Sequence, residues 1–356
     1  MTLAEIFQAN EGKGPSFDML RLFAALLVVF SHAFFITGAP NEAWSLVTRQ
    51  VSAGGFAVAV FFVLSGYVVT ESLKRNPAPW GFLRRRAFRI CPALITVVLV
   101  TVFLYGPAMT TLPLQDYFTA KGTFIYAISA LFPMKEVLPG VFQNAPSEFV
   151  NGNLWTLRYE FVCYAALALF GGIIIARPRV ALGATIGLIL LLGLLPTLRF
   201  TPSWAFMQFI HGLPLFACFG GGVCVSLYAG MLPVTRGWIV AAVFLFLLSL
   251  ETVGLSIVFP FVGAYLVAVV GNSRLLAFPN LRRGIWAGDF SYGIYIIGFP
   301  VQQAVRVASG GNSPWWANLL LSLPIVLVLA MLSWHFIEKP FLRLKYAGPS
   351  LFSRTT

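Results

Sequence analysis

The sequence predicts an all-α, polytopic integral membrane protein with about ten transmembrane helices. Of its 356 residues, 58% are hydrophobic and only 10% are charged, whereas a soluble domain carries about 25% charged residues. The mean hydropathy is +0.84. Apolar stretches recur along the whole chain, each close to the roughly 20 residues that a helix needs to cross the hydrocarbon core of a bilayer. A soluble protein of this length would need polar surface that this chain lacks.

These stretches divide the chain into ten expected spans and one long loop. The spans are expected at residues 17–38, 53–72, 90–106, 156–175, 180–196, 205–228, 237–251, 254–271, 289–308 and 315–337. The loop at about 107–155 is rich in proline and aromatic residues. We expect short helices in it, with aromatic side chains that either form an interfacial belt or stack on sugar rings. Residues 1–346 are expected to form one transmembrane domain, followed by a short tail at 347–356.

Basic residues set the expected orientation of the spans. If both termini are cytoplasmic, most of the 24 lysine and arginine residues fall on the cytoplasmic side, as the positive-inside rule requires. This pattern predicts a multi-pass inner-membrane protein. The net charge of +12 indicates a lipid bilayer rather than nucleic acid as the partner, because the charges lie between apolar spans. The four cysteines match no zinc or haem spacing, so no metal site is expected, and the oligomeric state is left open.

The first span carries ionisable groups, which are expensive inside a membrane and therefore call for a reason. Asp18 and Arg21 lie near its start, and His32 follows Arg21 by eleven residues. At 100° per residue this spacing returns both side chains to nearly one helix face, about 16 Å apart along the axis. The pair favours a functional site with the cation near the cytoplasm and the imidazole deeper. The alternative is an arginine that snorkels and a histidine satisfied by a neighbouring helix.

Other segments offer weaker signals, each with a structural alternative. Ser65 precedes Gly66, and the two either permit close helix packing or supply a nucleophile. Arg86 and Arg89 share a helix face, which suits bidentate phosphate binding but also ordinary anchoring at the cytoplasmic surface. Glu160 begins an apolar helix on the outer side, where a helix N-terminus stabilises a carboxylate.

Near the end of the chain, two further segments carry polar groups. Ser291 and Tyr295 lie four residues apart at the start of the ninth span and share a face. Glu338 follows the tenth span, and we expect it at the cytoplasmic interface, where anchoring and catalysis are equally compatible with its position. His211 is assigned to packing or to a helix kink.

Together, these segments resemble acyltransferase family 3, the membrane enzymes that O-acylate bacterial surface polysaccharides, lipopolysaccharide O-antigens and nodulation factors. The resemblance rests on Asp18-x-x-Arg21 with ten residues before His32, Phe61-Phe62-x-Leu64-Ser65-Gly66-Tyr67, Arg86-x-x-Arg89-Ile90-x-Pro92, Leu154-Trp155-Thr156-Leu157-x-x-Glu160, Ser291-Tyr292-x-x-Tyr295 and Glu338-Lys339-Pro340. Each motif is weak, but six in the right order are specific. The chain departs from many members at Gly298, where they carry a nearby histidine, and at Ala57-Val58-Ala59, where they carry Gly-Val-Asp. Those groups are therefore not essential in this chain.

The resemblance implies an acyl-CoA donor, most often acetyl-CoA, that enters from the cytoplasm and is not a permanently bound cofactor. Arg86 and Arg89 would hold its phosphates, and Arg21 would guide it inward. His32 would deprotonate a hydroxyl of a carbohydrate or glycolipid acceptor; an acyl-histidine intermediate is the less favoured route. Glu160 would orient His32 or bind the acceptor hydroxyl. The residues expected to support this site are Asp18, Ser65, Tyr159, Ser291 and Tyr295.

Two other functions remain compatible with the sequence. A transporter or flippase for a lipid-linked sugar or acyl group would share the number of spans, although the chain shows neither an internal repeat nor paired broken helices. A structural subunit or sensor would tolerate replacement of Arg21 and His32.

Overall fold

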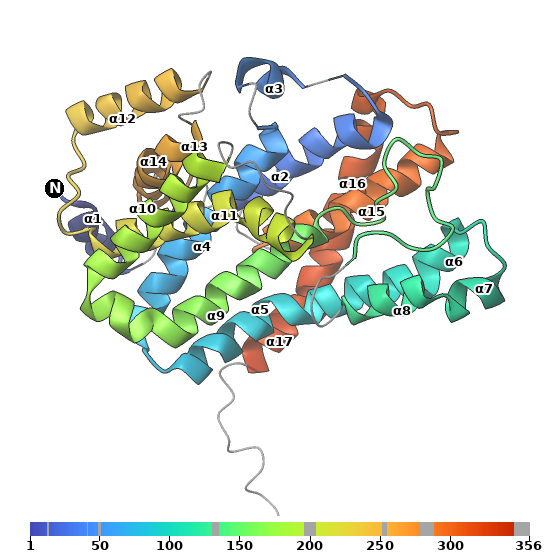
Figure 1. Cartoon of the computed structure of the whole chain (residues 1–356), viewed down its shortest axis with the longest axis horizontal. Helices are drawn as coiled ribbons and strands as arrows, with labels where there is room; N and C mark the ends of the chain where they lie inside the picture. The colour runs from blue at the N-terminus through green and yellow to red at the C-terminus, as the bar shows by residue number, and fades with distance from the viewer. Residues whose placement is uncertain are drawn as a thin grey trace, which may run out of the picture. The chain divides into compact units, whose positions relative to one another are not determined.

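The computed structural model describes residues 1–12, 14–40, 42–48, 51–129, 135–195, 204–250, 255–277 and 288–344. Within these ranges the chain is helical, and β-structure is limited to two isolated bridges, Thr2 with Pro233 and Thr110 with Val141. The predicted all-α class is therefore confirmed for the described residues (Figure 1). The expected tail at 347–356 lies outside them.

The helices follow one another along the chain, and η marks a π-helical turn. They are α1 Leu3–Ala9, α2 Phe17–Thr37, α3 Ala43–Thr48, α4 Ala53–Arg75, α5 Pro79–Val100, η1 Thr101–Tyr105, α6 Gly106–Met109, α7 Leu114–Thr119, α8 Lys121–Ile128, α9 Leu154–Ala176, α10 Pro178–Leu194, α11 Trp204–Leu227, α12 Arg236–Ser249, α13 Leu255–Val258, η3 Phe259–Gly263, α14 Ala264–Asn272, α15 Ser291–Ala308, α16 Trp315–Ser333, η6 Trp334–Glu338 and α17 Lys339–Leu344.

Every expected span coincides with one of these helices or with a run of them. Seven helical segments among the described residues are long and apolar enough to cross a membrane. The three other expected spans are α10, α12 and α15, which do not belong to those seven. At 1.5 Å per residue, the 14 residues of α12 reach only about 21 Å, less than the roughly 30 Å of a hydrocarbon core. The count of ten spans, and the cytoplasmic placement of both termini, stay predictions.

Two segments that lie between the expected spans contain helices. The third span was expected to begin at residue 90, but α5 begins at Pro79 and includes the basic run at 84–89. Proline suits the first turn of a helix, and leucine and arginine are good helix formers. Burial of Phe82 and Ile90 adds packing along this part of α5. The long loop contains α7 and α8, which confirms the short helices expected there.

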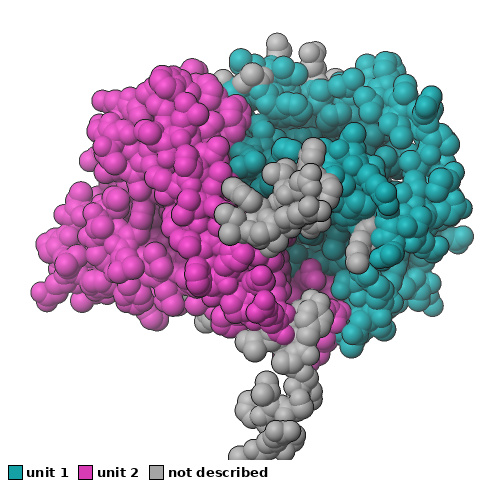
Figure 2. Space-filling model, turned by 180° about the vertical axis from the view of Figure 1, so that it is seen from behind, with its two compact units in different colours: residues 1–28, 41–79, 159–279 teal, residues 29–40, 80–158, 280–356 magenta. Residues whose placement is uncertain are grey.

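The chain folds into two compact units, each built from three separated segments (Figure 2). Unit 1 comprises residues 1–28, 41–79 and 159–279, and unit 2 comprises residues 29–40, 80–158 and 280–356. One boundary falls within α2 and another within α9, so both helices contribute to both units. Each unit is held together by its own helix packing.

In unit 1, α4 packs closely on α11. A Cβ atom added to Gly66 would lie 2.1 Å from the carbonyl oxygen of Phe219, and one added to Gly222 would lie 2.1 Å from the carbonyl oxygen of Val63. Neither position has room for a side chain. Small residues let helix backbones approach closely in membranes, so the packing role predicted for Gly66 is confirmed.

In unit 2, α15 packs on α16 and holds the loop that precedes α9. The buried Gln303 side chain donates hydrogen bonds to the carbonyls of Ser147 (3.0 Å) and Phe149 (2.8 Å). The Asn151 side chain donates to the carbonyl of Ile296 at 2.8 Å. These bonds satisfy backbone groups that would otherwise be buried without partners, and they fix the loop on the helix.

Candidate active site

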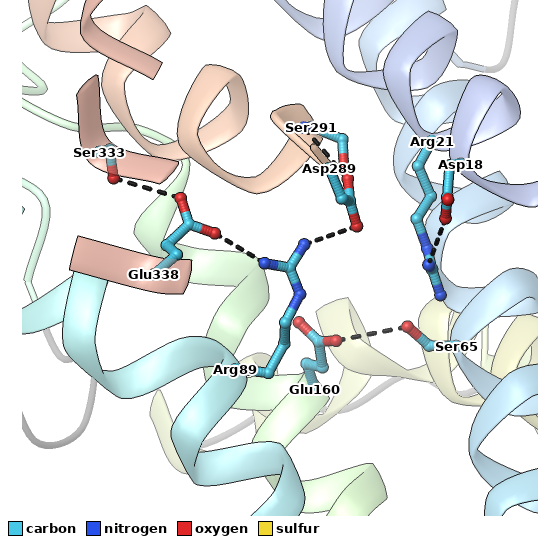
Figure 3. Close-up of polar contacts among 9 residues, drawn as sticks. All are labelled: Asp18, Arg21, Ser65, Arg89, Glu160, Asp289, Ser291, Ser333 and Glu338. Carbon is cyan, nitrogen blue, oxygen red and sulfur yellow. Dashed lines mark hydrogen bonds and ion pairs between the residues drawn. The ribbon is translucent and has the colours of Figure 1, made fainter. Parts of the chain in front are cut away.

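Arg21 and His32 both lie on α2, as predicted, but on opposite sides of the division between the units. Arg21 belongs to unit 1, where its Nη1 lies 3.6 Å from Oδ1 of Asp18, one turn earlier (Figure 3). Both side chains keep partial exposure. An ion pair of this kind contributes little stability, so it orients Arg21 more than it stabilises the helix.

His32 belongs to unit 2 and is partly buried. Its Nδ1 is buried and has no hydrogen-bond partner in the part of the chain that the structure describes. The ring packs edge to face against Phe299 of α15, with centroids 5.0 Å apart. One turn earlier on α2, the carbonyl of Val29 accepts a hydrogen bond from Gln302 at 2.8 Å. Contacts with α15 thus hold this end of α2, and the Nδ1 of the imidazole, which has no partner among the described residues, can accept or donate a proton.

Glu160 forms a hydroxyl-lined carboxylate site within unit 1. It accepts a hydrogen bond from Oγ of Ser65 on α4 at 3.3 Å (Figure 3). It also accepts one from the phenol of Tyr164, and Tyr164 is buried. The structure thus joins Ser65 and Glu160, which the sequence had indicated separately, and Tyr164 is a member that sequence reasoning missed. Its spacing of four residues from Glu160, on the same helix face, was the available signal.

Tyr159 makes a different contact from its neighbour Glu160. Its hydroxyl donates to the carbonyl of Gln208 on α11 at 2.9 Å. A Cβ atom on Gly212 would lie 2.6 Å from its ring. The structure therefore gives Tyr159 a contact that joins α9 to α11, and its predicted support of the site stays a prediction.

Arg89 is the centre of a second polar cluster, within unit 2, which we call the Arg89 clasp. Its Nη2 lies 2.7 Å from Asp289 and its Nη1 lies 2.6 Å from Glu338 (Figure 3). The rings of Tyr292 and Trp334 each lie 5.6 Å from its guanidinium carbon. The clasp thus comprises Arg89, Asp289, Glu338, Tyr292 and Trp334, and it joins α5 to the start of α15 and to η6.

The clasp gives two residues contacts that the sequence did not predict. Glu338 is 1% exposed and pairs with Arg89, while its expected place at the cytoplasmic interface stays a prediction. Asp289, the first residue of the expected span at 289–308, is the second partner of Arg89. Both terminal nitrogens of Arg89 already have carboxylate partners, and these are the groups that would bind a phosphate. The geometry therefore favours a structural role for Arg89, while its role in binding CoA stays a prediction, as does that of the half-buried Arg86.

Ser291 and Tyr295 bond to different parts of unit 2. The Ser291 hydroxyl and its backbone N–H both donate to Oδ1 of Asp289, which fixes the carboxylate that faces Arg89. The hydroxyl of Tyr295 shares a hydrogen bond of 2.6 Å with Thr156 in the first turn of α9. Ser291 therefore supports the clasp, and Tyr295 ties α15 to the start of α9.

Two further features of unit 2 bear on the site. A Cβ atom on Gly298 would lie 2.8 Å from a methyl group of Val29, so α15 and α2 meet too closely there for a larger side chain without movement. Glu136, in the loop between α8 and α9, pairs with Arg158 of α9. Burial raises the pKa of Glu136 above its ordinary value, although the Arg158 guanidinium opposes this shift.

Sequence comparison identifies the family. The family model described as an acyltransferase domain matches residues 15–335. The chain belongs to this family. The match covers nearly the whole helical part of the protein, including the Arg21–His32 pair and the Glu160 site, and it confirms the resemblance carried by the motifs. The protein is therefore a membrane acyltransferase, not a transporter of related topology.

Individual relatives are similar along nearly the whole chain. It is 28% identical over 341 residues to the O-acetyl transferase of Shigella phage Sf6, covering 93% of this chain and 96% of the relative. It is 30% identical over 368 residues to nodulation protein 10 of Rhizobium leguminosarum bv. viciae, covering 94% and 95%. The peptidoglycan O-acetyltransferase OatA of Listeria monocytogenes is 26% identical, over 92% of this chain and 55% of its own length. No solved structure matches the chain significantly.

Proposed function

We propose that this acyltransferase moves an acetyl group from acetyl-CoA to a hydroxyl of a cell-envelope or exported carbohydrate, in the bacterial inner membrane with both termini cytoplasmic. Relatives along most of the chain bear the names O-acetyl transferase and peptidoglycan O-acetyltransferase. The observation that carries the proposal is His32, an ionisable residue inside an apolar helix whose buried Nδ1 has no partner among the described residues. Such residues in membrane spans usually have a functional reason.

In the proposed reaction, the neutral imidazole of His32 takes the proton of the acceptor hydroxyl. The hydroxyl oxygen attacks the thioester carbonyl, a C–O bond forms, and the C–S bond breaks. The CoA thiolate leaves and receives a proton from the imidazolium, so the products are an O-acetyl ester and free CoA. Arg21 and Arg86 are the proposed contacts for the donor, and Glu160, with its hydroxyl partners Ser65 and Tyr164, is the proposed contact for the acceptor.

The test is transfer of labelled acetyl from acetyl-CoA to envelope glycan by the purified protein in nanodiscs. His32→Ala and the near-isosteric His32→Gln are expected to lower the rate by at least about a hundredfold, the usual contribution of a general base, with no change in the elution profile of the folded protein. Mass spectrometry of the glycan locates the acetyl ester. Wild-type rates of acetyl transfer in both variants would refute the mechanism. If the glycan stays unlabelled with every labelled acyl-CoA that is offered as donor, the proposed function is refuted.

A further inference from the structure

Gln302 is a buried glutamine of α15, in unit 2, that reaches the end of α2. The residue is 0% exposed, and its Nε2 donates a hydrogen bond to the carbonyl of Val29 at 2.8 Å. Its Oε1 is buried and has no hydrogen-bond partner among the residues that the structure describes. An amide with an unmet acceptor is costly in an apolar interior. Packing alone therefore gives no reason for a glutamine here, rather than a leucine or methionine of similar size.

The hydrogen bond from Gln302 reaches the turn of α2 that carries His32. In an α-helix the carbonyl of residue 29 points toward the N–H of residue 33, so it closes the turn that contains His32. Phe299, one turn before Gln302 on α15, contacts the imidazole itself, with ring centroids 5.0 Å apart. Helix α15 thus contacts the His32 turn at two successive points, through an aromatic contact to the ring and a hydrogen bond to the backbone.

Both contact residues of α15 are themselves held by neighbours in unit 2. Phe299 is 1% exposed, and a Cβ atom added to Gly152 would lie 2.7 Å from its ring, so the ring has no room to move toward the loop before α9. The buried side chain of Asn318 on α16 donates to the backbone carbonyl of Gln302 at 2.9 Å. The two points that meet the His32 turn are therefore fixed before α2 packs on them.

We propose that Gln302 is a positioning residue for His32: its hydrogen bond to Val29 sets the rotation and height of the His32 turn against α15, and so the direction in which the imidazole meets the acceptor hydroxyl. The inference rests on the proposed function, because it concerns the residue that acts there as the base. Apolar contacts tolerate small rotations of a helix, whereas a hydrogen bond restricts both a distance and an angle. A displacement of about 1 Å can lower a rate about a hundredfold, so even a small rotation of α2 affects the reaction.

Magic-angle-spinning NMR of the histidine rings observes this positioning without any acyl transfer. The chain has 3 histidines, so the full-length protein labelled with ¹³C,¹⁵N-histidine in nanodiscs gives a separate set of ring signals for each, and His32→Gln identifies the set of His32. The test variant is Gln302→Met, which keeps the length of the side chain and removes the donor. The matched control is Gln303→Met, because Gln303 is also 0% exposed but donates to the carbonyls of Ser147 and Phe149 rather than to α2.

Gln302→Met should move the ring signals of His32 by more than a linewidth and leave those of His211 and His335 in place. Its kcat for acetyl transfer should fall about tenfold to a hundredfold, with the elution profile of the folded protein unchanged. Gln303→Met should leave the His32 signals within a linewidth of their wild-type positions. If Gln302→Met fails to fold, Gln302→Asn tests the same contact, because it keeps the amide but is one methylene too short for the bond to α2.

Unchanged His32 signals in the folded Gln302 variants would overturn the inference. An equal movement of these signals in Gln303→Met would overturn it as well, because it would show a general loosening of α15. Moved signals together with a wild-type kcat, in a protein that His32→Gln inactivates, would remove this inference alone. If His32→Gln transfers acetyl at the wild-type rate, the proposed mechanism fails, while moved signals in Gln302→Met still show that Gln302 fixes the imidazole.

Discussion

Replacement of Arg89 by alanine distinguishes a structural clasp from a phosphate site. The substitution removes the guanidinium and leaves the carboxylates of Asp289 and Glu338, which are 15% and 1% exposed, without their shared partner. Breaking a buried ion pair by removing one member costs about 3–5 kcal/mol. Because Arg89 itself keeps 22% exposure, water screens part of this interaction, and we expect the lower end, about 3 kcal/mol.

The measurement is thermal unfolding of the purified protein in detergent. With an unfolding entropy of about 2.1 cal/mol/K per residue, a chain of 356 residues shifts its Tm by about 1.3 °C per kcal/mol, so Arg89→Ala should lower Tm by roughly 4 °C. The control is Arg84→Ala, which removes an exposed arginine from the same helix and should change stability by less than about 0.5 kcal/mol.

A double substitution isolates the interaction itself. If Arg89 and Glu338 stabilise each other, Arg89→Ala combined with Glu338→Gln should cost less than the sum of the two single changes, because no buried charge is left alone. An Arg89→Ala protein with the Tm of wild type but a strongly weakened affinity for acetyl-CoA would refute the clasp. It would instead make Arg89 a phosphate ligand.

Three further predictions follow from single sites. Tyr164→Phe removes a hydroxyl donor from Glu160. Because a hydrogen bond to a charged group contributes about 1.5–3 kcal/mol, the substitution should reduce the rate of acetyl transfer about tenfold or more. An unchanged rate and an unchanged pH profile would exclude Tyr164 from the site. Gly66→Ala should destabilise the protein by about 1–3 kcal/mol through overpacking. The control is Gly230→Ala, which should not destabilise it, because a Cβ atom added at Gly230 has no other atom within 4 Å. Equal Tm values for the two variants would contradict the close approach of α4 and α11. Burial raises the pKa of Glu136, so the folded state favours the protonated carboxyl group. The stability of the protein should therefore fall as the pH rises from about 4.5 through the raised pKa of Glu136. Glu136→Gln should remove this part of the pH dependence of Tm, and parallel profiles of Tm against pH for the wild type and the variant would refute the prediction.

Much of the fold was predictable because the relevant signals are local. A run of about twenty apolar residues must be helical to cross a bilayer, and this rule identified the positions of α2, α4, α9 and α16. The same local geometry predicted that Arg21 and His32 lie on one helix. It was less accurate at the ends of helices, as at α5, where the basic run continues the helix beyond the apolar span.

The candidate site was only partly predictable, because its contacts join distant parts of the chain. Ser65 and Glu160 were each singled out from their own segment, but their hydrogen bond spans 95 residues. Both the buried Nδ1 of His32, which has no partner among the described residues, and the close approach of Val29 to Gly298 depend on how α15 packs against the end of α2. Sequence periodicity shows which side of a helix is polar, but it does not show what that side meets.

The sequence by itself determined the membrane class, the helix positions and the family, because hydropathy and motif order belong to each segment alone. Only the tertiary structure decided that Arg89 faces Asp289 and Glu338, which lie 200 and 249 residues away. It also decided that Ser65 of α4 donates a hydrogen bond to Glu160 of α9. The physical reason is that ion pairs and cavities depend on the packing of separate helices, and a buried charge takes whichever partner that packing brings within reach.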